Sequence, residues 1–300
     1  MALLRAEAEK LQLPELIRGV IEEIVTTDEM TFNVVPFKNI GSALIYEYNR
    51  ELSLGAQAAE YIVPETTDAT GESAATFTKI QVKPTVLIAA VDVPRLYRGD
   101  PIQTATQLQK KAKQVARLFA QQMVVGSGTI PQMNSLVSVA GTGSQTFAAG
   151  ASGAALSLTF LDQVCDLIPN GANALIMPSR TIRSYKALLR SAGGTDAAMM
   201  QLPNYSRPVL TYNGIPILKN DWLPLTETEG GSGAACNSIY AVRFNEDDGV
   251  CAIMSGGSVV DVTGPIAIKN SDRDNYVVTM RTNFAVHSTL SLARVRGITN

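Results

Sequence analysis

The last part of the chain carries the pattern that most restricts the possible fold. Between residues 277 and 292 the side chains alternate, so two sets of positions fall on opposite faces of one extended strand. Strands usually have about five or six residues, so we expect this one to be bent or broken. We also expect it to pair with a hairpin or to pack beneath a long helix. One face comprises Val278, Met280, Thr282, Phe284, Val286, Ser288, Leu290 and Leu292.

A long helix is predicted from Pro101 to about Val125. Asp100 is placed to cap its first turn, and two glycines, Gly126 and Gly128, follow its end. At ~1.5 Å per residue such a helix would be roughly 37 Å long, which is long for a globular protein. We interpret its lysines as a solvated face. The apolar stripe comprises Leu108, Ala112, Val115, Phe119 and Met123, and the lysines are Lys110, Lys111 and Lys113.

Residues 42–93 are typical of a long hairpin. Its second arm alternates, with Ile80, Val82, Val86 and Ile88 predicted to share one face. Pro84 has no N–H to donate, so it indicates an edge or bulged position. The segment between the arms, residues 64–75, is polar and rich in turn-forming residues. Because an isolated two-stranded hairpin is only marginally stable in water, it needs a surface to lie on, and a neighbouring subunit would supply one.

The first 28 residues include a short helical pattern with a single apolar stripe. Two interpretations stay open, a helix packed on its own domain or an arm laid on a neighbouring subunit. The stripe comprises Leu16, Ile17, Val20, Ile21 and Ile24.

Residues 126–264 predict a mixed block of helices and strands. The glycine-rich stretch 126–157 is interpreted as a loop region, because it lacks the Lys-Ser or Lys-Thr pair of a phosphate-binding loop. Helices are predicted at 158–168 and from Ser179, as its cap, to about Arg190. Residues 245–249 predict a hairpin turn, and residues 229–233 a flexible loop. Strands are predicted at 174–177, 209–212, 215–218, 239–244, 250–254 and 258–262.

The composition favours a chain that is extensively buried against partners. Hydrophobic residues make up 46% and charged residues only 17%, below the usual ~25%. The net charge is −2, so the excess of Lys and Arg that drives tight non-specific DNA binding is missing. No apolar run spans a membrane and no secretory signal pattern is present, which predicts a protein kept in the cytoplasm until it is released. The unpaired cysteines, predicted to be small buried residues in a reducing compartment, are Cys165, Cys236 and Cys251.

We predict no catalytic, cofactor-binding or metal-binding residues. The only histidine excludes sites that need two, and no G-x-S-x-G motif accompanies it. We interpret it as a partly exposed strand histidine, and the acidic clusters as structural. The residues weighed are His287, the turn residues Asp247 and Asp248, and Asp272 and Asp274, which would cap the last strand or pair with Arg281.

Two sequence segments, and the order of the predicted elements along the chain, resemble those of a known protein family. Tyr212-Asn-Gly-Ile-Pro-Ile217, continuing to Pro224, looks like a G-x-P strand of an axial domain. Asp272-Arg-Asp-Asn-Tyr276, continuing to Arg281, looks like the segment that enters the last strands of a peripheral domain. In this order, across nearly the whole chain, the sequence resembles the HK97-like major capsid proteins of tailed double-stranded DNA bacteriophages.

The resemblance implies an α+β fold of four parts. Residues 1–28 would be the N-arm and residues 42–91 the E-loop hairpin. Residues 129–264 would form the axial domain. The peripheral domain would comprise residues 29–41, 92–128 and 265–300, with a spine helix at about 101–125.

The resemblance also implies function by assembly and not by catalysis. Pentamers and hexamers of the chain would tile an icosahedral shell, part of a virion assembled in the host cytoplasm, around double-stranded DNA held without sequence-specific contacts. Implied partners are further copies, a portal protein and a decoration protein, with no membrane. Because Met1 lies almost at the arm, we expect a separate scaffolding protein or none. Lys79 and Lys83 lie on the E-loop, but no acceptor aligns with them, so no covalent crosslink is predicted.

Two alternatives remain at this stage. An encapsulin, a bacterial shell around cargo enzymes, shares the implied fold. A hydrolase that uses His287 is the alternative from a different class of protein.

Overall fold

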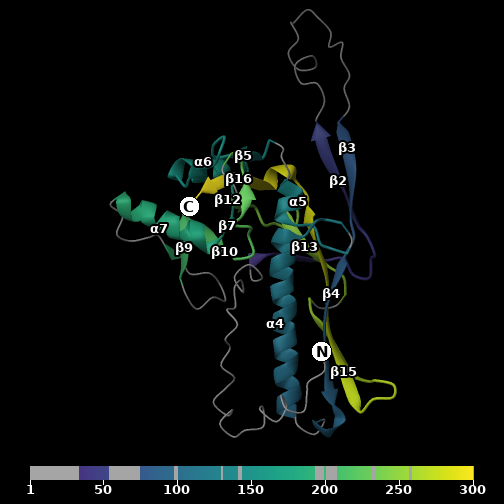
Figure 1. Cartoon of the computed structure of the whole chain (residues 1–300). Helices are drawn as coiled ribbons and strands as arrows, with labels where there is room; N and C mark the ends of the chain where they lie inside the picture. Colours follow the sequence, from purple (N-terminus) through teal and green to yellow (C-terminus); the bar gives the residue numbers. More distant parts are fainter. Residues whose placement is uncertain are drawn as a thin grey trace, which may run out of the picture.

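The computed structural model describes residues 34–53, 75–97, 101–129, 131–140, 144–192, 199–200, 208–231, 234–256 and 259–299. The predicted N-arm helix, the predicted tip of the hairpin and the predicted cap Asp100 lie outside these residues. The described part combines one long helix and several short ones with three sheets (Figure 1). The α+β class predicted from the sequence is therefore confirmed.

The long helix α4 spans Pro101–Val125, as predicted, and runs along the elongated part of the molecule (Figure 1). The C-terminal part of its apolar stripe is fully buried, with Phe119 and Met123 at 0% exposure. The Phe119 ring lies between two others, with its centroid 5.7 Å from that of Phe37 and 5.4 Å from that of Phe284. Burial of this stripe, at about 25 cal/mol per Å², holds the helix on the sheet beneath it.

A five-stranded sheet lies under α4, with the predicted alternating strand at its centre. The apolar face of that strand enters the main core together with the buried residues of α4. The expected break is present, because a single 3-10 turn, Thr289–Ser291 (η3), ends the alternation. The strands are β15 (Arg273–Val286), paired with β4 (Thr85–Pro94) on one side and with β13 (Val250–Met254) and β14 (Asp261–Ala267) on the other, while β1 (Phe37–Asn39) lies parallel to β13.

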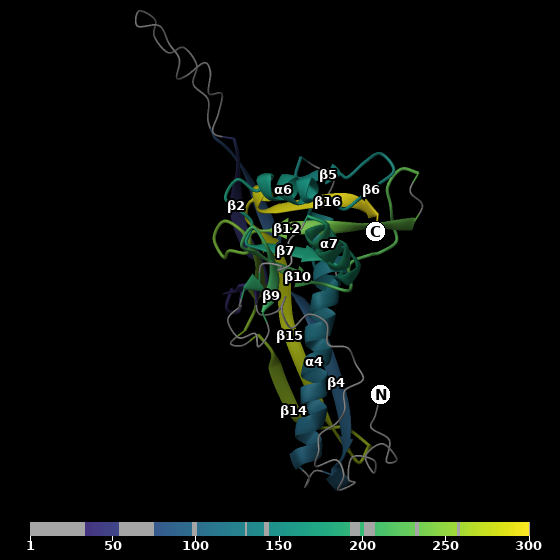
Figure 2. The same cartoon turned by 90° about the vertical axis from the view of Figure 1, so that its left-hand side faces the viewer.

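A nine-stranded sheet forms the other large layer (Figure 2). Successive residues of β7 (Ala174–Met177) face opposite cores, so that Ile176 meets the main core and Leu175 a second core under two helices. Burial on both faces explains why this strand is a continuous apolar run. The other strands are β5 (Thr146–Ala148), β6 (Ala154–Ala155), β8 (Met199–Met200), β9 (Val209–Tyr212), β10 (Ile215–Lys219), β11 (Glu227–Thr228), β12 (Ala234–Val242) and β16 (Leu292–Thr299); the short helices are α5 (Leu136–Ala140), α6 (Leu158–Asp166) and α7 (Ser179–Ser191).

Strand pairing divides the end of the chain differently from the predicted domains. β13, assigned to the axial block, pairs with β15 in the five-stranded sheet, and β16, assigned to the peripheral domain, pairs with β12 in the nine-stranded sheet. Residues 245–249 therefore do not close a hairpin; they carry the chain from one sheet to the other. Alternation specifies a strand, but its partner depends on packing against distant segments, which the local pattern does not contain.

The predicted hairpin is also shorter than expected. β2 (Tyr46–Ser53) pairs with β3 (Thr76–Val82), whereas β4 leaves to join β15. Lys83 and Pro84 separate the two strands and reverse the alternation, so Val82 is buried while Val86 and Ile88 are 48% and 57% exposed. The prediction that these three residues share one face is wrong, because the interruption turns the following strand over.

Smaller differences concern the bounds of elements. The residue before α7 is Pro178, and its helix starts at Ser179 without a side-chain cap, so the predicted Ser179 cap is wrong. α6 ends two residues before the predicted position, at Asp166. The strand predicted at 239–244 is the longer β12, and the one predicted at 258–262 is displaced to β14. Such shifts occur where turn residues and not hydrophobic periodicity set the ends.

Candidate assembly surfaces

The hairpin of β2 and β3 is attached to the body at its base. The Tyr48 hydroxyl donates to the Val286 carbonyl at 2.7 Å, and Arg50 Nε donates to the His287 carbonyl at 3.0 Å. Arg50 Nη2 also donates to the Val286 carbonyl. Beyond this anchor the two arms extend past the rest of the described chain, and Phe77 is 63% exposed (Figure 1). The hairpin thus presents surface that its own subunit does not cover.

His287 belongs to this anchor. Its Nε2 bonds with the Tyr46 hydroxyl at 2.9 Å, its Nδ1 lies 3.3 Å from the Gly249 carbonyl, and its ring centroid is 4.8 Å from that of Tyr48. Burial lowers the pKa of His287, although the Gly249 carbonyl opposes that shift. Nε2 thus holds the hairpin while Nδ1 faces the body, as expected of a structural histidine just beyond the end of β15.

The acidic residues weighed from the sequence do not converge on one site. Asp248 pairs with Arg243 at 3.1 Å, and Asp247, whose side chain is 91% exposed, lies 3.8 Å from Lys38. Exposed pairs of this kind contribute little to stability. The predicted partner of Asp274 was wrong: its carboxylate, buried in β15, pairs with Arg95 at 3.1 Å and not with Arg281. Asp272 is exposed.

The outer face of β4 carries exposed apolar side chains that were predicted to share a face with the buried Val82. Val86 and Ile88 lie on it, opposite Arg281 and Thr279 of β15. They face outward because the alternation reverses at Lys83 and Pro84. The sequence marks Pro84 as an edge or bulged position, but the alternation itself gives no sign of the reversal. Exposed apolar groups beside a projecting hairpin are typical of surfaces that are buried by a partner.

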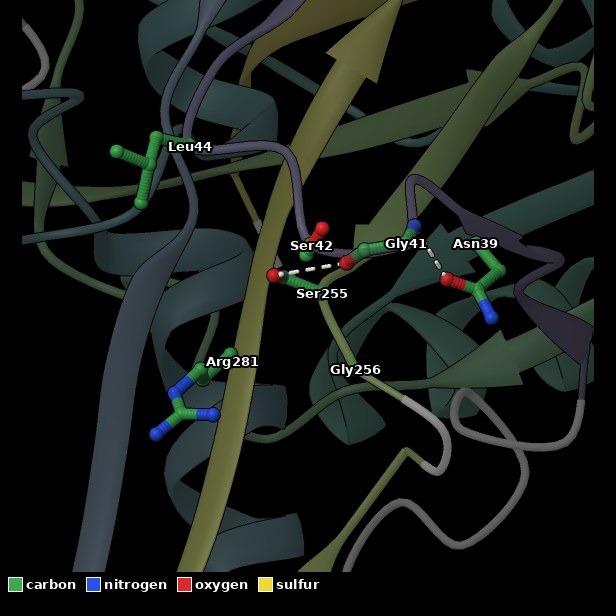
Figure 3. A pocket seen from close by; sticks show the side chains of 7 residues that line it. All are labelled: Asn39, Gly41, Ser42, Leu44, Ser255, Gly256 and Arg281. Carbon is green, nitrogen blue, oxygen red and sulfur yellow. Dashed lines mark hydrogen bonds between the residues drawn. The ribbon is translucent and has the colours of Figure 1, made fainter.

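A pocket of about 790 Å³ opens where the loop before β2 meets the loop after β13 (Figure 3). Ser255 donates to the Gly41 carbonyl at 3.1 Å, which ties the two loops together, and the Gly41 N–H donates to Asn39 Oδ1 at 2.7 Å within its own segment. Leu44, 86% exposed, and Arg281 form its open side. Its lining combines one cation with small polar groups and contains no histidine, cysteine or carboxylate.

The two lysines weighed for a crosslink lie on β3 and directly after it. Lys79 pairs with Glu47 across the hairpin, and Lys83 is exposed where its carbonyl accepts from Asn283. Among the three cysteines, Cys236 and Cys251 are buried, and Cys165 is partly buried. Burial raises the pKa of both Cys165 and Cys251 to about 11.

Within the described ranges, no group of three His, Cys, Asp or Glu side chains is placed to hold a metal ion. No helix in the part of the chain that the structure describes is long and apolar enough to cross a membrane.

The sequence matches no family model and no curated protein. Solved structures do match over nearly the whole chain. The holo-SrpI encapsulin complex from Synechococcus elongatus PCC 7942 aligns with a TM-score of 0.73 and 15% identity, over 100% of this chain and 97% of that chain. The capsid of a native GTA particle aligns with a TM-score of 0.65 and 16% identity, over 94% of each chain. Microbacterium phage Oxtober96 aligns with a TM-score of 0.62 and 15% identity, over 99% of each.

These matches define the class of fold. It is the HK97-like capsid fold predicted from the sequence, with a long helix on a sheet, a projecting hairpin and a second sheet layer. At such low identity the likeness establishes the fold and leaves the function to be argued from the surfaces.

Proposed function

We propose that this protein is a shell subunit that self-assembles through pentamers and hexamers into a closed icosahedral shell. The observation that carries the proposal is the agreement of the fold, over 94–100% of the chain, with chains of a capsid and of an encapsulin. A likeness confined to one layer would support only a shared domain. Here the aligned region includes the projecting hairpin, whose arms extend beyond the rest of the described chain and are free to contact another copy (Figure 1).

The chemistry of the surface supports assembly. The hairpin is bonded to the body only near its base among the described contacts, and two-stranded hairpins gain little stability alone. Burying the exposed β4 face and Phe77 against other copies would contribute about 25 cal/mol per Å² of apolar surface removed from water. A charged content of 17% leaves few charges to desolvate in such interfaces.

We further propose the roles of the four parts. Residues 1–28 serve as the N-arm and the hairpin as the E-loop, and both lap over neighbouring copies. The five-stranded sheet with α4 is the core of the peripheral domain, and the nine-stranded sheet, which includes β16, is the core of the axial domain. The axial domains gather at the centres of the rings.

For the contents of the shell we propose double-stranded DNA, which makes the protein the major capsid protein of a tailed bacteriophage. It would reside in the virion and work with a portal protein, and it would not be an enzyme. An encapsulin that encloses cargo enzymes is the second candidate. The specific observation in its favour is the TM-score of 0.73 with an encapsulin chain.

Electron microscopy of the full chain expressed alone, beside particles from its native source, tests both the shell and its proposed contents. We expect closed shells or tubes from the expressed protein and DNA-filled tailed particles from the source. Native shells that contain protein cargo and no DNA would replace the phage proposal by the encapsulin. A protein that stays monomeric when concentrated, and when mixed with candidate scaffolding proteins, would overturn the shell proposal.

A further inference from the structure

Helix α7 has a face that the core of its own chain does not cover. The helix contains four cationic residues and no Asp or Glu. They recur at intervals of three or four residues, which places them along one side of an α-helix. From first to last they span about 15 Å along the axis. The four are Arg180, Arg183, Lys186 and Arg190.

The opposite side of α7 fixes the helix firmly to the nine-stranded sheet. Tyr185 is 3% exposed and its hydroxyl donates to the Thr211 carbonyl at 3.0 Å. Thr181 is fully buried and donates to Asn237 Oδ1 at 2.9 Å. Ile182 and Leu188 pack against the second core. Because this inner side is fully engaged, the cationic side must face outward on a rigid element.

The cations on that outer side have no counter-charge in the described chain. Arg183, Lys186 and Arg190 are exposed and Arg180 is half-buried. None of them takes part in the ion pairs formed among the described residues. In a protein whose net charge is −2, four unpaired positive charges on one helix side form a local positive field.

The composition of the face favours phosphates over a protein surface. α7 has no exposed large hydrophobic residue, whereas protein interfaces usually have an apolar core. The neighbouring helix α6 carries only Asp162 and Asp166, and Asp162 already accepts from the Tyr212 hydroxyl, so a second copy of α6 would not neutralise four cations. Arginine, three of the four residues, suits phosphate because its planar fork donates two parallel hydrogen bonds.

We propose that the outer face of α7 is a contact surface for the phosphate backbone of double-stranded DNA. B-form DNA presents one negative charge per ~1.7 Å of axis, so a duplex laid along the helix offers more phosphates than the four cations can use. The contact reads no sequence, since it consists of charge alone. This inference deepens the proposed function and rests on the version of it in which the shell encloses DNA. Figure 1 shows α7 on the side of the molecule away from the hairpin.

The test is a salt titration of binding by fluorescence anisotropy, with the full chain in unassembled form and a labelled 30-base-pair duplex. With up to four phosphate contacts the slope of log K against log salt would be about −3.6, so affinity would fall about 100-fold between 50 and 200 mM salt. The variant R183Q/R190Q keeps good helix formers and removes two cations. Its slope should be about −1.8, with a fall of about 10-fold over the same range.

A matched control removes the same charge from the other end of the molecule. K269Q/R273Q changes two exposed cations at the turn between β14 and β15, and it should behave as the unchanged protein. Circular dichroism and thermal unfolding of each variant check that the fold is retained.

Three outcomes would overturn the inference. They are no duplex binding by the unchanged protein at 50 mM salt, an unchanged slope in R183Q/R190Q, or an equal loss in K269Q/R273Q. If R183Q/R190Q retained the full slope but no longer formed shells, the face would be a contact between copies instead. Because the titration uses unassembled protein, its failure is distinct from failure to form shells, which microscopy of the same variants reports.

Discussion

Asn283 joins three segments that are distant in the sequence, and its replacement by alanine should weaken the whole fold. Its Oδ1 accepts from the backbone N–H groups of Asn134 and Phe284, both at 2.8 Å, and its Nδ2 donates to the Lys83 carbonyl at 2.7 Å. Asn283 itself is 6% exposed. These bonds tie the end of the hairpin and the segment after α4 to the central strand.

The cost of N283A follows from the groups that it leaves without partners. The Phe284 N–H is buried and the Asn134 N–H is partly buried, while the carbonyl of exposed Lys83 can turn to water. Each buried group that loses its partner costs about 1–3 kcal/mol. We expect a total of about 2–4 kcal/mol, which at a urea slope near 3 kcal/mol per M is a midpoint shift of roughly 1 M.

Urea unfolding of the unassembled full chain, followed by circular dichroism, measures the shift. N49A is the matched control, because Asn49 is exposed on β2, and it should change the free energy of unfolding by less than about 0.5 kcal/mol. If the free energy of unfolding of N283A lay within about 0.5 kcal/mol of that of the unchanged protein, the argument that this amide ties the end of the hairpin and the segment after α4 to the central strand would be refuted.

Three further predictions follow from the same contacts. Because burial lowers the pKa of His287 below 6.5, its stabilisation of the hairpin is present above pH 6.5 and is lost as pH falls through the lowered pKa; hydrogen exchange of β2 and β3 should therefore speed up at pH 5, and H287Q should remove most of this pH dependence. V86S/I88S should change the free energy of unfolding by less than about 0.5 kcal/mol but reduce shell formation seen by light scattering, and normal shells would count against the β4 face as an interface. Cys251, with its pKa raised to about 11 by burial, should resist iodoacetamide at pH 7.5 until the chain is unfolded, and rapid native labelling would contradict its burial.

The elements with strong periodicity were predictable from the sequence. α4 begins and ends where its stripe and flanking glycines place it, and the apolar face of β15 is the one that meets the core. Such patterns act locally, since a helix or strand must turn its apolar side away from water whatever its partner. The turn at Asn213 and Gly214 is also local, because both residues have positive φ and join β9 to β10.

The candidate surfaces were much less predictable. Nothing in the alternation indicates that Lys83 and Pro84 turn β4 over and expose Val86 and Ile88. The role of His287 in holding Tyr46 depends on two segments far apart in the sequence. The cations of α7 are visible in the sequence, but only the packing of Tyr185 and Thr181 shows that they face outward together.

By itself the sequence determined the strongly periodic elements, such as α4 and β15, the α+β class, and the order of parts that resembles a capsid protein. It did not show α5, β5 and β6, which lie in the stretch 126–157 that was predicted to be a loop region. Tertiary structure alone decided which strands pair, so that β13 lies in the five-stranded sheet and β16 in the nine-stranded one. The physical reason is the range of the forces involved. Hydrophobic periodicity and turn geometry are set by residues within one or two turns of chain, whereas strand pairing and exposed surfaces result from competition among distant segments for the same core.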